Sequence, residues 1–452
     1  MIVVVALILA ITASASEPSA EDLPIVRVTK GLGAHGYGAL RVSVVDSNPS
    51  SSAPSVFTYS SPFLHRWTSL YLESYLITEV SPGQSTLLPT GRPDVGDNGD
   101  ISFSLPPQGT GVKGIFFGDP CSEPDFVGCI HFDDGTSMQT RLPRLLNALA
   151  PSIDFRVMIG DNLYDRDGDI TTRFFGQLTP EAQHSVVDIA VLGNHDLYWA
   201  GSDLLRTRLD PFGNGFLQFN AQDSILSKDD SVNFLDLSVD PDAGATADAR
   251  WPNSLPAADN FLSYYSVGNV GFITYSGAHA WDDYRDGAFE EACAYFSGEV
   301  ENDATSVIFL AGHWNQQELG ATSCAPDMDT PSIFQRLSSL KGCDSGKLRY
   351  VTGHTHCNEI MDQDAQGSPI GYLLGGTGVY SGSSGCNSFG FAYTDTSDER
   401  ELVVAFNLAY DNREEAPPST DMYDEIVSCF EKSGVGQCLH YGDVWRNTSL
   451  VL

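Results

Sequence analysis

The sequence predicts a layered α/β fold that follows a small antiparallel β domain. From Gly114 onwards, short apolar runs alternate with stretches of helical character, as in α/β proteins. Before that point, short β-type runs are separated by turn clusters rich in Ser, Pro and Gly. The chain has 452 residues, of which 42% are apolar, enough for two or three domains with a sizeable core.

The first 16 residues, MIVVVALILAITASAS, have the character of a signal peptide. Their apolar run is too short to span a bilayer, and small residues follow it at Ala13–Ala15. Later runs are not long enough for a membrane helix. We therefore predict a signal peptide over residues 1–16. The mature protein should be exported, to the extracellular space or to a lysosome- or vacuole-like compartment, with no membrane partner.

Residues 17–110 are expected to form the N-terminal β domain. The candidate strands are RVSVV, SVFTYS, SYLITEV and ISFSL, and turn clusters such as SPGQ and DVGDNGD separate them. No motif of chemical character stands out in this region. We expect it to have a structural or docking role.

Residues 111–410 carry the α/β pattern, with strands expected at GIFFGD, DFRVMIGD, DIAVLGNHD, GFITYSGAHAW, TSVIFLAGHWN and LRYVTGHTH. In the helix predicted at TRLPRLLNALA, four leucines share one face: Leu142, Leu145, Leu146 and Leu149. In TPEAQHSVV, Thr179 is a candidate N-cap and Pro180 the first helical residue. Further helices are expected at FEEACAYF and TPSIFQRLSSL. Residues 411–452 form a tail with one helix, MYDEIVSCFEKSG, that ends at Gly434.

The formal net charge of −35 opposes binding to nucleic acid or to anionic lipid, so neither is an expected partner. An anionic substrate would need strong local positive charge. Nine cysteines in an exported chain predict disulfides. The candidate near-neighbour pairs are Cys121 with Cys129 and Cys429 with Cys438, and the odd count leaves one thiol over. Asn447 begins a glycosylation sequon.

Five of the apolar strands end in the same way, with a Gly followed by a polar donor. These ends are Gly118-Asp119, Gly160-Asp161, Gly193-Asn194-His195-Asp196, Gly312-His313 and Gly353-His354-Thr355-His356. One such motif alone is more often a turn or a pair of structural histidines. Five together predict a metal site, because sites in α/β folds gather beyond the carboxyl ends of strands. Oxygen and nitrogen donors suit hard or borderline cations, and six or seven are too many for one tetrahedral ion.

The order GD…GDxxY…GNHD…GH…GHxH resembles the calcineurin-like metallophosphoesterases, and more closely the purple acid (tartrate-resistant) phosphatases. The resemblance covers residues 112–410, and GYLLGGTGVYSG and FGFAYTD are also similar to the C-terminal strands of that family. It implies a metallophosphoesterase β-sandwich flanked by helices. It also implies a dinuclear centre of Fe³⁺ and a second, divalent metal, which is Fe²⁺, Zn²⁺ or Mn²⁺. Residues 17–110 lie outside it.

The first motif departs from the general superfamily pattern. That pattern is Asp-x-His, whereas this chain has Asp119-Pro120-Cys121. Purple acid phosphatases also lack this His and have a Tyr three residues after the second Asp, where this chain has Tyr164. The alternative is that Tyr164 is an ordinary aromatic residue at a strand end. Cys121 could reach the metal, but we favour a disulfide to Cys129.

The resemblance assigns the remaining roles residue by residue. The ferric ligands would be Asp119, Tyr164 and His356, the bridging ligand Asp161, and the divalent-metal ligands Asn194, His313 and His354. His195 would be a proton donor or phosphate contact, with Asp196 orienting it. His279 either lines the cleft or is a structural histidine.

The activity that the resemblance implies is that of a secreted acid phosphatase. It would hydrolyse phosphate monoesters of small molecules with a metal-bound hydroxide as nucleophile. One alternative is a phosphodiesterase or nucleotidase that uses the same site, a choice that depends on loops such as residues 201–260. The other is a secreted binding protein with a catalytically silent site.

Overall fold

The computed structural model describes residues 23–47, 56–58, 71–121, 128–165, 168–197, 216, 219–220, 258–298, 304–315, 327–344, 346–380, 388–397, 400–409 and 417–449, apart from residues 32, 33, 35, 91 and 94. The predicted signal peptide and nearly all of residues 201–257 lie outside these ranges. No helix in the described ranges has the length and apolar character needed to cross a membrane.

Two large β-sheets form the centre of the molecule. The ten-stranded sheet has the order β18-β17-β16-β7-β8-β9-β1-β2-β4-β3, and the six-stranded sheet has the order β10-β11-β12-β13-β15-β14. The strands are β1 Ile25–Thr29, β2 Leu40–Asp46, β3 Val56–Thr58, β4 Tyr71–Ile77, β5 Ser85–Pro89, β6 Asp100–Ser104, β7 Lys113–Phe117, β8 Phe155–Ile159, β9 Val187–Val191, β10 Ser263–Val267, β11 Val270–Thr274, β12 Val307–Ala311, β13 Leu348–Thr352, β14 Asn358–Gln363, β15 Pro369–Leu374, β16 Ser388–Asp395, β17 Arg400–Ala409 and β18 Asp443–Ser449.

The two large sheets pack face to face. One cluster of buried apolar residues includes members of both sheets. Aromatic rings from the two sheets are in contact within it: the ring centroids of Phe116 in β7 and Phe309 in β12 are 5.0 Å apart, and those of Phe155 in β8 and Phe272 in β11 are also 5.0 Å apart. The central strands are buried on both faces, which fits their unbroken apolar runs.

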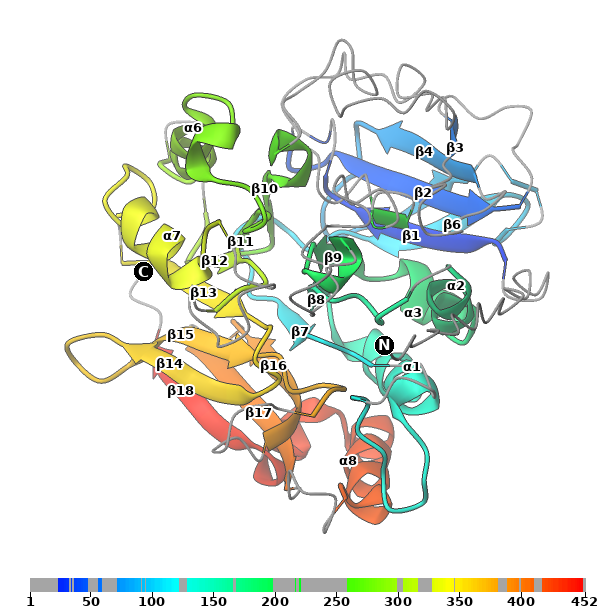
Figure 1. Ribbon diagram of the computed structural model, residues 1–452. Helices are drawn as coiled ribbons and strands as arrows, with labels where there is room; N and C mark the ends of the chain where they lie inside the picture. The colour runs from blue at the N-terminus through cyan, green and yellow to red at the C-terminus, as the bar shows by residue number, and fades with distance from the viewer. Residues whose placement is uncertain are drawn as a thin grey trace, which may run out of the picture.

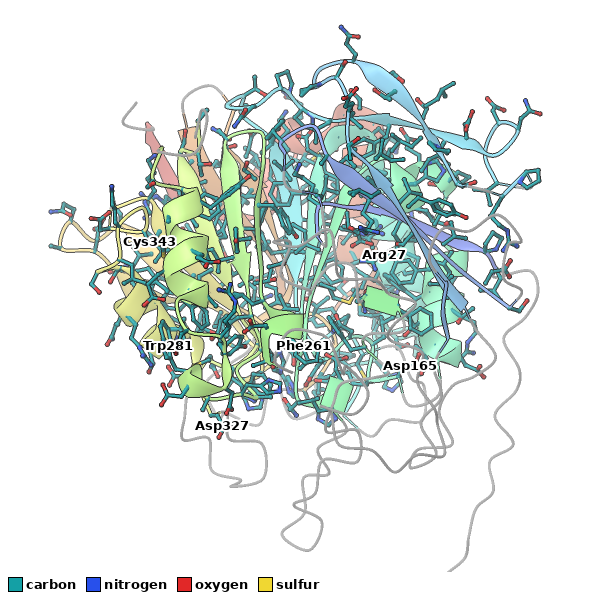
Figure 2. The ribbon with its side chains drawn as sticks, turned by 90° about the horizontal axis from the view of Figure 1, so that it is seen from above. Arg27, Asp165, Phe261, Trp281, Asp327 and Cys343 are labelled. Carbon is teal, nitrogen blue, oxygen red and sulfur yellow. A yellow bond between two sulfur atoms is a disulfide. The ribbon has the colours of Figure 1, made fainter. Side chains whose placement is uncertain are left out.

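Helices cover the outer faces of both sheets (Figures 1 and 2). The helices are α1 Met138–Leu149, α2 Asp169–Gly176, α3 Pro180–His184, α6 Ala288–Tyr295, α7 Thr330–Leu337 and α8 Thr420–Ser433. The cluster beneath α1, α2, α3 and α8 lies on the ten-stranded sheet, and the cluster beneath α6 and α7 lies on the six-stranded sheet. The predicted β-sandwich flanked by helices is therefore confirmed.

The local helix signals are also confirmed. All four leucines predicted to share a face of α1 are fully buried. The side chain of Thr179 accepts a hydrogen bond from the amide of Ala182 at 3.2 Å, and Pro180 is the first residue of α3. Helix α8 ends at Gly434, which has a φ of 73°.

The N-terminal region contains only strands among its described regular elements, as predicted for residues 17–110. Strands β5 and β6 form a separate two-stranded sheet. Strands β1 to β4, in contrast, continue the ten-stranded sheet, because β1 pairs in parallel with β9 at Val28 and Val187. The boundary at residue 110 remains a prediction. No local signal in the sequence indicates this extension of the sheet.

Two further features concern the C-terminal region and the cysteines. After α8 the chain adds β18 to the edge of the ten-stranded sheet, beside β17, whereas only a helix was expected in residues 411–452. The predicted disulfides Cys121–Cys129 and Cys429–Cys438 are both present. A third links Cys293 in α6 to Cys343 in the turn that follows α7, and Cys357 is disulfide-bonded as well.

Candidate metal centre

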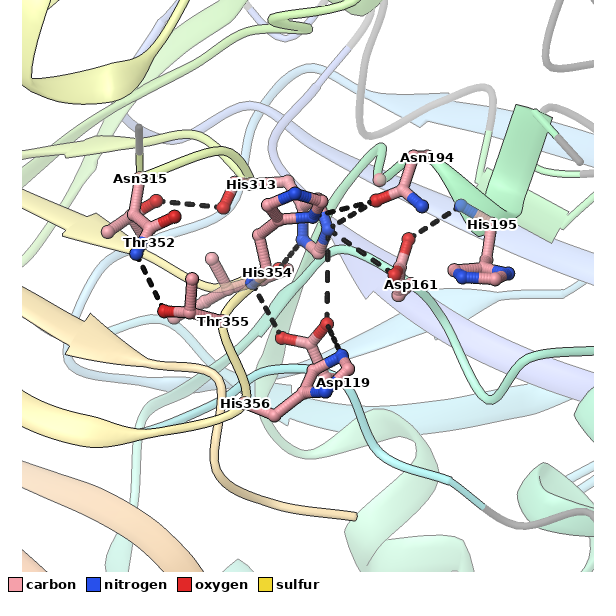
Figure 3. A network of polar contacts seen from close by, with 12 residues as sticks. Asp119, Asp161, Asn194, His195, His313, Asn315, Thr352, His354, Thr355 and His356 are labelled. Atoms are coloured by element: carbon pink, nitrogen blue, oxygen red, sulfur yellow. Dashed lines mark hydrogen bonds and ion pairs between the residues drawn. The ribbon is translucent and has the colours of Figure 1, made fainter. Parts of the chain in front are cut away.

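The five strand ends singled out in the sequence meet at one place in the structure. Strands β7, β8 and β9 are parallel neighbours in one sheet, and β12 and β13 are parallel neighbours in the other. Their carboxyl ends therefore lie at a common edge of the sandwich. The side chains that follow them form a single network of polar contacts (Figure 3). The network contains Asp119, Asp161, Asn194, His195, His313, His354 and His356.

The glycines before these residues are needed for two different reasons. Gly160 has a φ of 80°, which a side chain would disfavour, and a Cβ there would lie 2.5 Å from Nδ1 of His313. A Cβ on Gly353 would lie 2.6 Å from Oδ2 of Asp119. The backbone must come this close for the donors to converge.

Positive φ angles in residues other than glycine concentrate at this site. In the described chain they occur at Asn98, Asp119, Asp161, Leu163, Tyr164, His354 and His356, and all but the first belong to the site or its loops. Such conformations cost about 1–3 kcal/mol each and persist only where surrounding contacts enforce them. The strain is thus concentrated on the predicted ligands.

One half of the site is formed by Asp119, Tyr164 and His356. The phenol of Tyr164 donates a hydrogen bond to Oδ1 of Asp119 at 3.1 Å, and its Oη also lies 3.1 Å from Nε2 of His356. Oδ2 of Asp119 accepts a hydrogen bond from the amide of His354 at 2.9 Å. The three side chains that were expected to hold the trivalent ion therefore touch one another.

The other half is formed around the amide oxygen of Asn194. This Oδ1 lies 3.1 Å from Nε2 of His313 and 2.9 Å from Nδ1 of His354. Asp161 lies between the halves: its Oδ2 is 3.4 Å from Nε2 of His313, and its Oδ1 accepts a hydrogen bond from the amide of His195 at 2.7 Å. Ligand atoms of Asp161 also lie within 4.8 Å of those of Asp119 and His356, so this residue is close to members of both halves.

Backbone carbonyls orient two of the imidazoles. Nδ1 of His313 donates to the carbonyl of Ile159 at 2.9 Å, and Nδ1 of His356 donates to the carbonyl of Tyr380 at 2.9 Å. Each contact directs the ring's other nitrogen, Nε2, toward the acidic side chains. Histidines that bind metals are commonly held in this way.

The donor set fits cations. Oδ2 of Asp161 is buried and makes no hydrogen bond among the described residues, and its charge is met only by the ion-pair contact with Nε2 of His313 at 3.4 Å. Ligand atoms of Asp119, Asp161 and His356 all lie within 4.8 Å of one another. Buried carboxylates with an open oxygen, next to imidazole nitrogens, form a site for hard or borderline metal ions.

The pKa values of these groups reflect burial without a cation. Burial, and then the charge of Asp161, raises the pKa of Asp119 well above its ordinary value. Burial also lowers the pKa of His354 to about 3 and that of His356 to about 4, the latter in spite of the bond to the Tyr380 carbonyl. For His313, the charges of Asp161 and Asp119 outweigh burial and raise the pKa to about 9. Neutral His354 and His356 are in the form that binds metal.

The predicted catalytic residues lie beside the ligands in different roles. The ring of His195 is half-buried and its centroid lies 4.7 Å from that of Tyr164. The carboxylate of Asp196 accepts hydrogen bonds from the amide of Gly193 at 2.7 Å and from the amide and side chain of Asn162 at 3.0 and 2.8 Å. Asp196 therefore ties together the loops that carry Asp161 and Asn194.

Two residues that support the site were missed in the sequence. Asn162 is bound to Asp196 as described, and Asn315 donates to the hydroxyl of Thr355 at 2.6 Å, between the two histidines of the last motif. Both follow a ligand by one or two positions, which is the only signal that could have identified them. His279 stacks on Phe261, with ring centroids 5.5 Å apart, and contacts Ser276, which favours its structural alternative.

Comparisons with known proteins agree with this geometry. The calcineurin-like phosphoesterase family model matches residues 125–358. No curated protein matches the sequence. A solved purple acid phosphatase from seeds of yellow lupin (Lupinus luteus) has a similar fold, with a TM-score of 0.53, 14% identity, and coverage of 88% of this chain and 73% of that one. A structure of PhoD gives a TM-score of 0.45 with 11% identity and 90% coverage of both chains.

The matched range covers slightly more than half of the chain and includes four of the five strand ends. Asp119 lies just before it, and the structure brings this residue into contact with the others. The chain belongs to the calcineurin-like phosphoesterase family.

Proposed function

We propose that this protein is an exported acid phosphatase that hydrolyses phosphate monoesters at a dinuclear metal centre. The observation that carries the proposal is the position of Tyr164, whose Oη lies 3.1 Å from both Asp119 Oδ1 and His356 Nε2. A phenol in that place would supply, as a phenolate, the anionic oxygen donor that suits a trivalent ion. It stands in for the histidine of the general superfamily motif.

The residues divide into two sets of ligands. Asp119, Tyr164 and His356 would hold Fe³⁺, Asn194, His313 and His354 would hold Fe²⁺, Zn²⁺ or Mn²⁺, and Asp161 would contribute to both. Bound cations would neutralise charge on the phosphoryl oxygens and activate water for attack on phosphorus. They would also provide the positive charge that an anionic substrate needs in a protein of net charge −35.

His195 is the chain's own candidate for proton transfer. Its amide is fixed by Asp161, and its half-buried ring lies beside Tyr164 at the edge of the ligand cluster. From there an imidazolium could give its proton to the leaving alkoxide oxygen. Export is supported by the disulfides, which persist in oxidising compartments.

A panel of aryl esters tests the proposal. We expect the purified protein, with metals bound, to hydrolyse p-nitrophenyl phosphate faster than bis(p-nitrophenyl) phosphate, with its optimum below neutral pH. Asn194→Ala should remove one metal ion and most of the activity, because Asn194 Oδ1 joins His313 and His354. Asn147→Ala is the matched control, because Asn147 bonds to Gln177 on the helical layer.

Three other results would contradict the proposal in different ways. Faster turnover of the diester would favour the phosphodiesterase alternative. Two bound metals without turnover of either ester would favour the binding protein. An Asn194→Ala variant with unchanged metal content and activity would refute the ligand assignment.

A further inference from the structure

The disulfide between Cys121 and Cys129 lies directly against the candidate metal centre. Cys121 follows the ligand Asp119 by two residues. Both cysteines belong to a small buried cluster with Tyr164 and Val379, in which the four residues are 0%, 1%, 3% and 4% exposed. The disulfide therefore forms part of the apolar wall around the Tyr164 ring.

The same disulfide anchors the backbone that orients His356. Cys129 pairs with Val379 in an isolated antiparallel bridge. Two backbone hydrogen bonds flank this bridge. The amide of Tyr380 donates a hydrogen bond to the carbonyl of Gly128 at 2.8 Å, and the amide of Ile130 donates one to the carbonyl of Gly378 at 2.9 Å. The carbonyl of Tyr380 accepts the Nδ1 hydrogen bond of His356 at 2.9 Å.

A third set of contacts joins this backbone to the first motif. The amide of Thr377 donates to the carbonyl of Gly118 at 3.3 Å, next to Asp119. Residues 377–380 thus lie between the strand end that carries Asp119 and the residues around Cys129. The disulfide between Cys121 and Cys129 joins these same two segments covalently.

We infer that the Cys121–Cys129 disulfide is a positioning element for one half of the metal centre, the half formed by Asp119, Tyr164 and His356. This inference rests on the proposed function. Tyr164 and His356 both have positive φ angles, of 55° and 53°, so their conformations need support from their surroundings. The disulfide supports the phenol by packing and the imidazole through the Tyr380 carbonyl.

The other half of the centre has different supports. His313 bonds through Nδ1 to the carbonyl of Ile159 in β8, and its own carbonyl accepts a hydrogen bond from Thr352 in β13 at 2.8 Å. These hydrogen bonds connect His313 to central strands of both sheets and do not involve the disulfide. Loss of the Cys121–Cys129 bond should therefore weaken the binding of one metal ion and leave the other ion bound.

The chain offers a matched control in Cys429–Cys438. The two disulfides have sequence separations of 8 and 9, so the chain-entropy effect of removing either bond on the unfolded state should be nearly equal. Cys429–Cys438 closes the turn after α8, in the helical layer on the ten-stranded sheet. A difference between the two variants then reports on positioning instead of general stability.

The experiment compares Cys121→Ser/Cys129→Ser with Cys429→Ser/Cys438→Ser and the unchanged protein. Metal content after dialysis against buffered free Zn²⁺ or iron, the dissociation constant of each ion, the visible absorption and the Tm are measured. We expect the first variant to lose about 10- to 100-fold in affinity for one ion, the usual effect of removing a contact to a metal ligand. The second ion should stay bound, and the control should keep both.

The outcomes separate this inference from the proposed function. An unchanged protein that binds fewer than two ions would refute the dinuclear centre itself. Two ions bound with unchanged affinity in the first variant, or equal losses in the control, would overturn the positioning role. If the serine pair does not fold, Cys121→Ala/Cys129→Val retains apolar packing, and selective loss of one ion is expected again. If neither double variant of Cys121 and Cys129 folds while the control variant does, the disulfide is a general stability element and the inference is overturned.

Discussion

At the scale of single residues, the phenol of Tyr164 lies among acidic neighbours in a buried position. Burial, and then the charges of Asp119 and Asp161, raise the pKa of Tyr164 well above its ordinary value. Without a cation the phenol is therefore neutral and donates a hydrogen bond to Asp119. A bound trivalent ion would reverse this balance, because the ion's charge favours the phenolate.

Tyr164→Phe tests that reversal by colour. A phenolate bound to ferric iron absorbs visible light, so the oxidised protein should be violet to pink and the variant colourless. The variant should also bind the trivalent ion less well, because one anionic donor is gone while Asp119, Asp161 and His356 remain. Absorption spectra and metal analysis measure both effects. A colourless unchanged protein with two Zn²⁺ or Mn²⁺ ions, expressed with iron available, would refute the ferric site and leave the family assignment intact.

His195→Ala tests proton transfer. We expect both metals to remain, because the ring of His195 is not among the ligands, while alkyl phosphates are hydrolysed about 10² to 10⁴-fold more slowly. An activated aryl phosphate should be affected less, since its leaving group needs no proton. Rates for both ester types are measured, with His440→Ala as the control at an exposed histidine. Equal slowing of both ester types would mean that His195 binds phosphate and is not the acid.

At the scale of elements, β1 is attached to the catalytic sheet by a buried ion network. Nε of Arg27 in β1 lies 2.6 Å from Oδ2 of Asp188 in β9, and Arg156 of β8 reaches the same oxygen at 2.8 Å. Arg27 also donates to the carbonyl of Phe219 and the side chain of Asn220, each at 2.8 Å. Figure 2 labels Arg27 beside the N-terminal strands. The network therefore links β1 to both β8 and β9 in the ten-stranded sheet.

Removing the acidic member of this network should destabilise the fold strongly. Asp188→Ala would leave two buried guanidinium groups without their counter-charge, which costs about 3–5 kcal/mol of unfolding free energy. Asp424→Ala breaks an ion pair with Arg144 whose side chains are 42% and 46% exposed, and should cost at most about 1 kcal/mol. Urea unfolding compares the two variants. Similar losses in both would show that the buried network does not hold β1 in place.

At the scale of the whole molecule, stability should depend on pH through Lys30. This lysine follows β1, is buried, and donates to the carbonyls of Tyr37 at 2.6 Å and Ala39 at 3.0 Å. Burial lowers its pKa from 10.5 to about 7. Between these values the unfolded chain binds a proton that the folded protein does not. Raising the pH from 7 toward 10 therefore stabilises the fold, and the charged form costs stability below pH 7.

Lys30→Met should remove that dependence. As the pH rises from 7 to 10, the unfolding free energy of the unchanged protein should increase relative to that of the variant. The slope should be at most about 1.4 kcal/mol per pH unit. It should be flat below pH 7. Urea unfolding at several pH values measures it, and Lys432→Met at an exposed lysine controls for the loss of a charge. A pH-independent difference would contradict the prediction.

Much of the fold and of the site could be predicted because the signals are local. The four buried leucines of α1, the N-cap Thr179 and the Gly434 stop each act within one or two helical turns. Most of the predicted ligands were identified in the same way, because each follows a strand and its glycine directly in the chain. Tyr164 and His356 lie three and two positions after such a residue, Asp161 and His354 respectively. The Cys121–Cys129 pair was predictable because only 8 positions separate its members.

The contacts between these local units depend on the tertiary structure. Asn194 meets His313 across 119 positions, and Tyr164 meets His356 across 192, so no local pattern specifies either contact. The role of Asp196 as a link between two loops arises from the same packing. The contact of β1 with β9 includes a buried ion pair between Arg27 and Asp188, which lie 161 positions apart in the chain. The sequence by itself determined which side chains could bind metal, because backbone turns and donor types are local properties. Only the packing of the two sheets decided which of those side chains share a site, because that packing buries apolar faces from the whole chain at once.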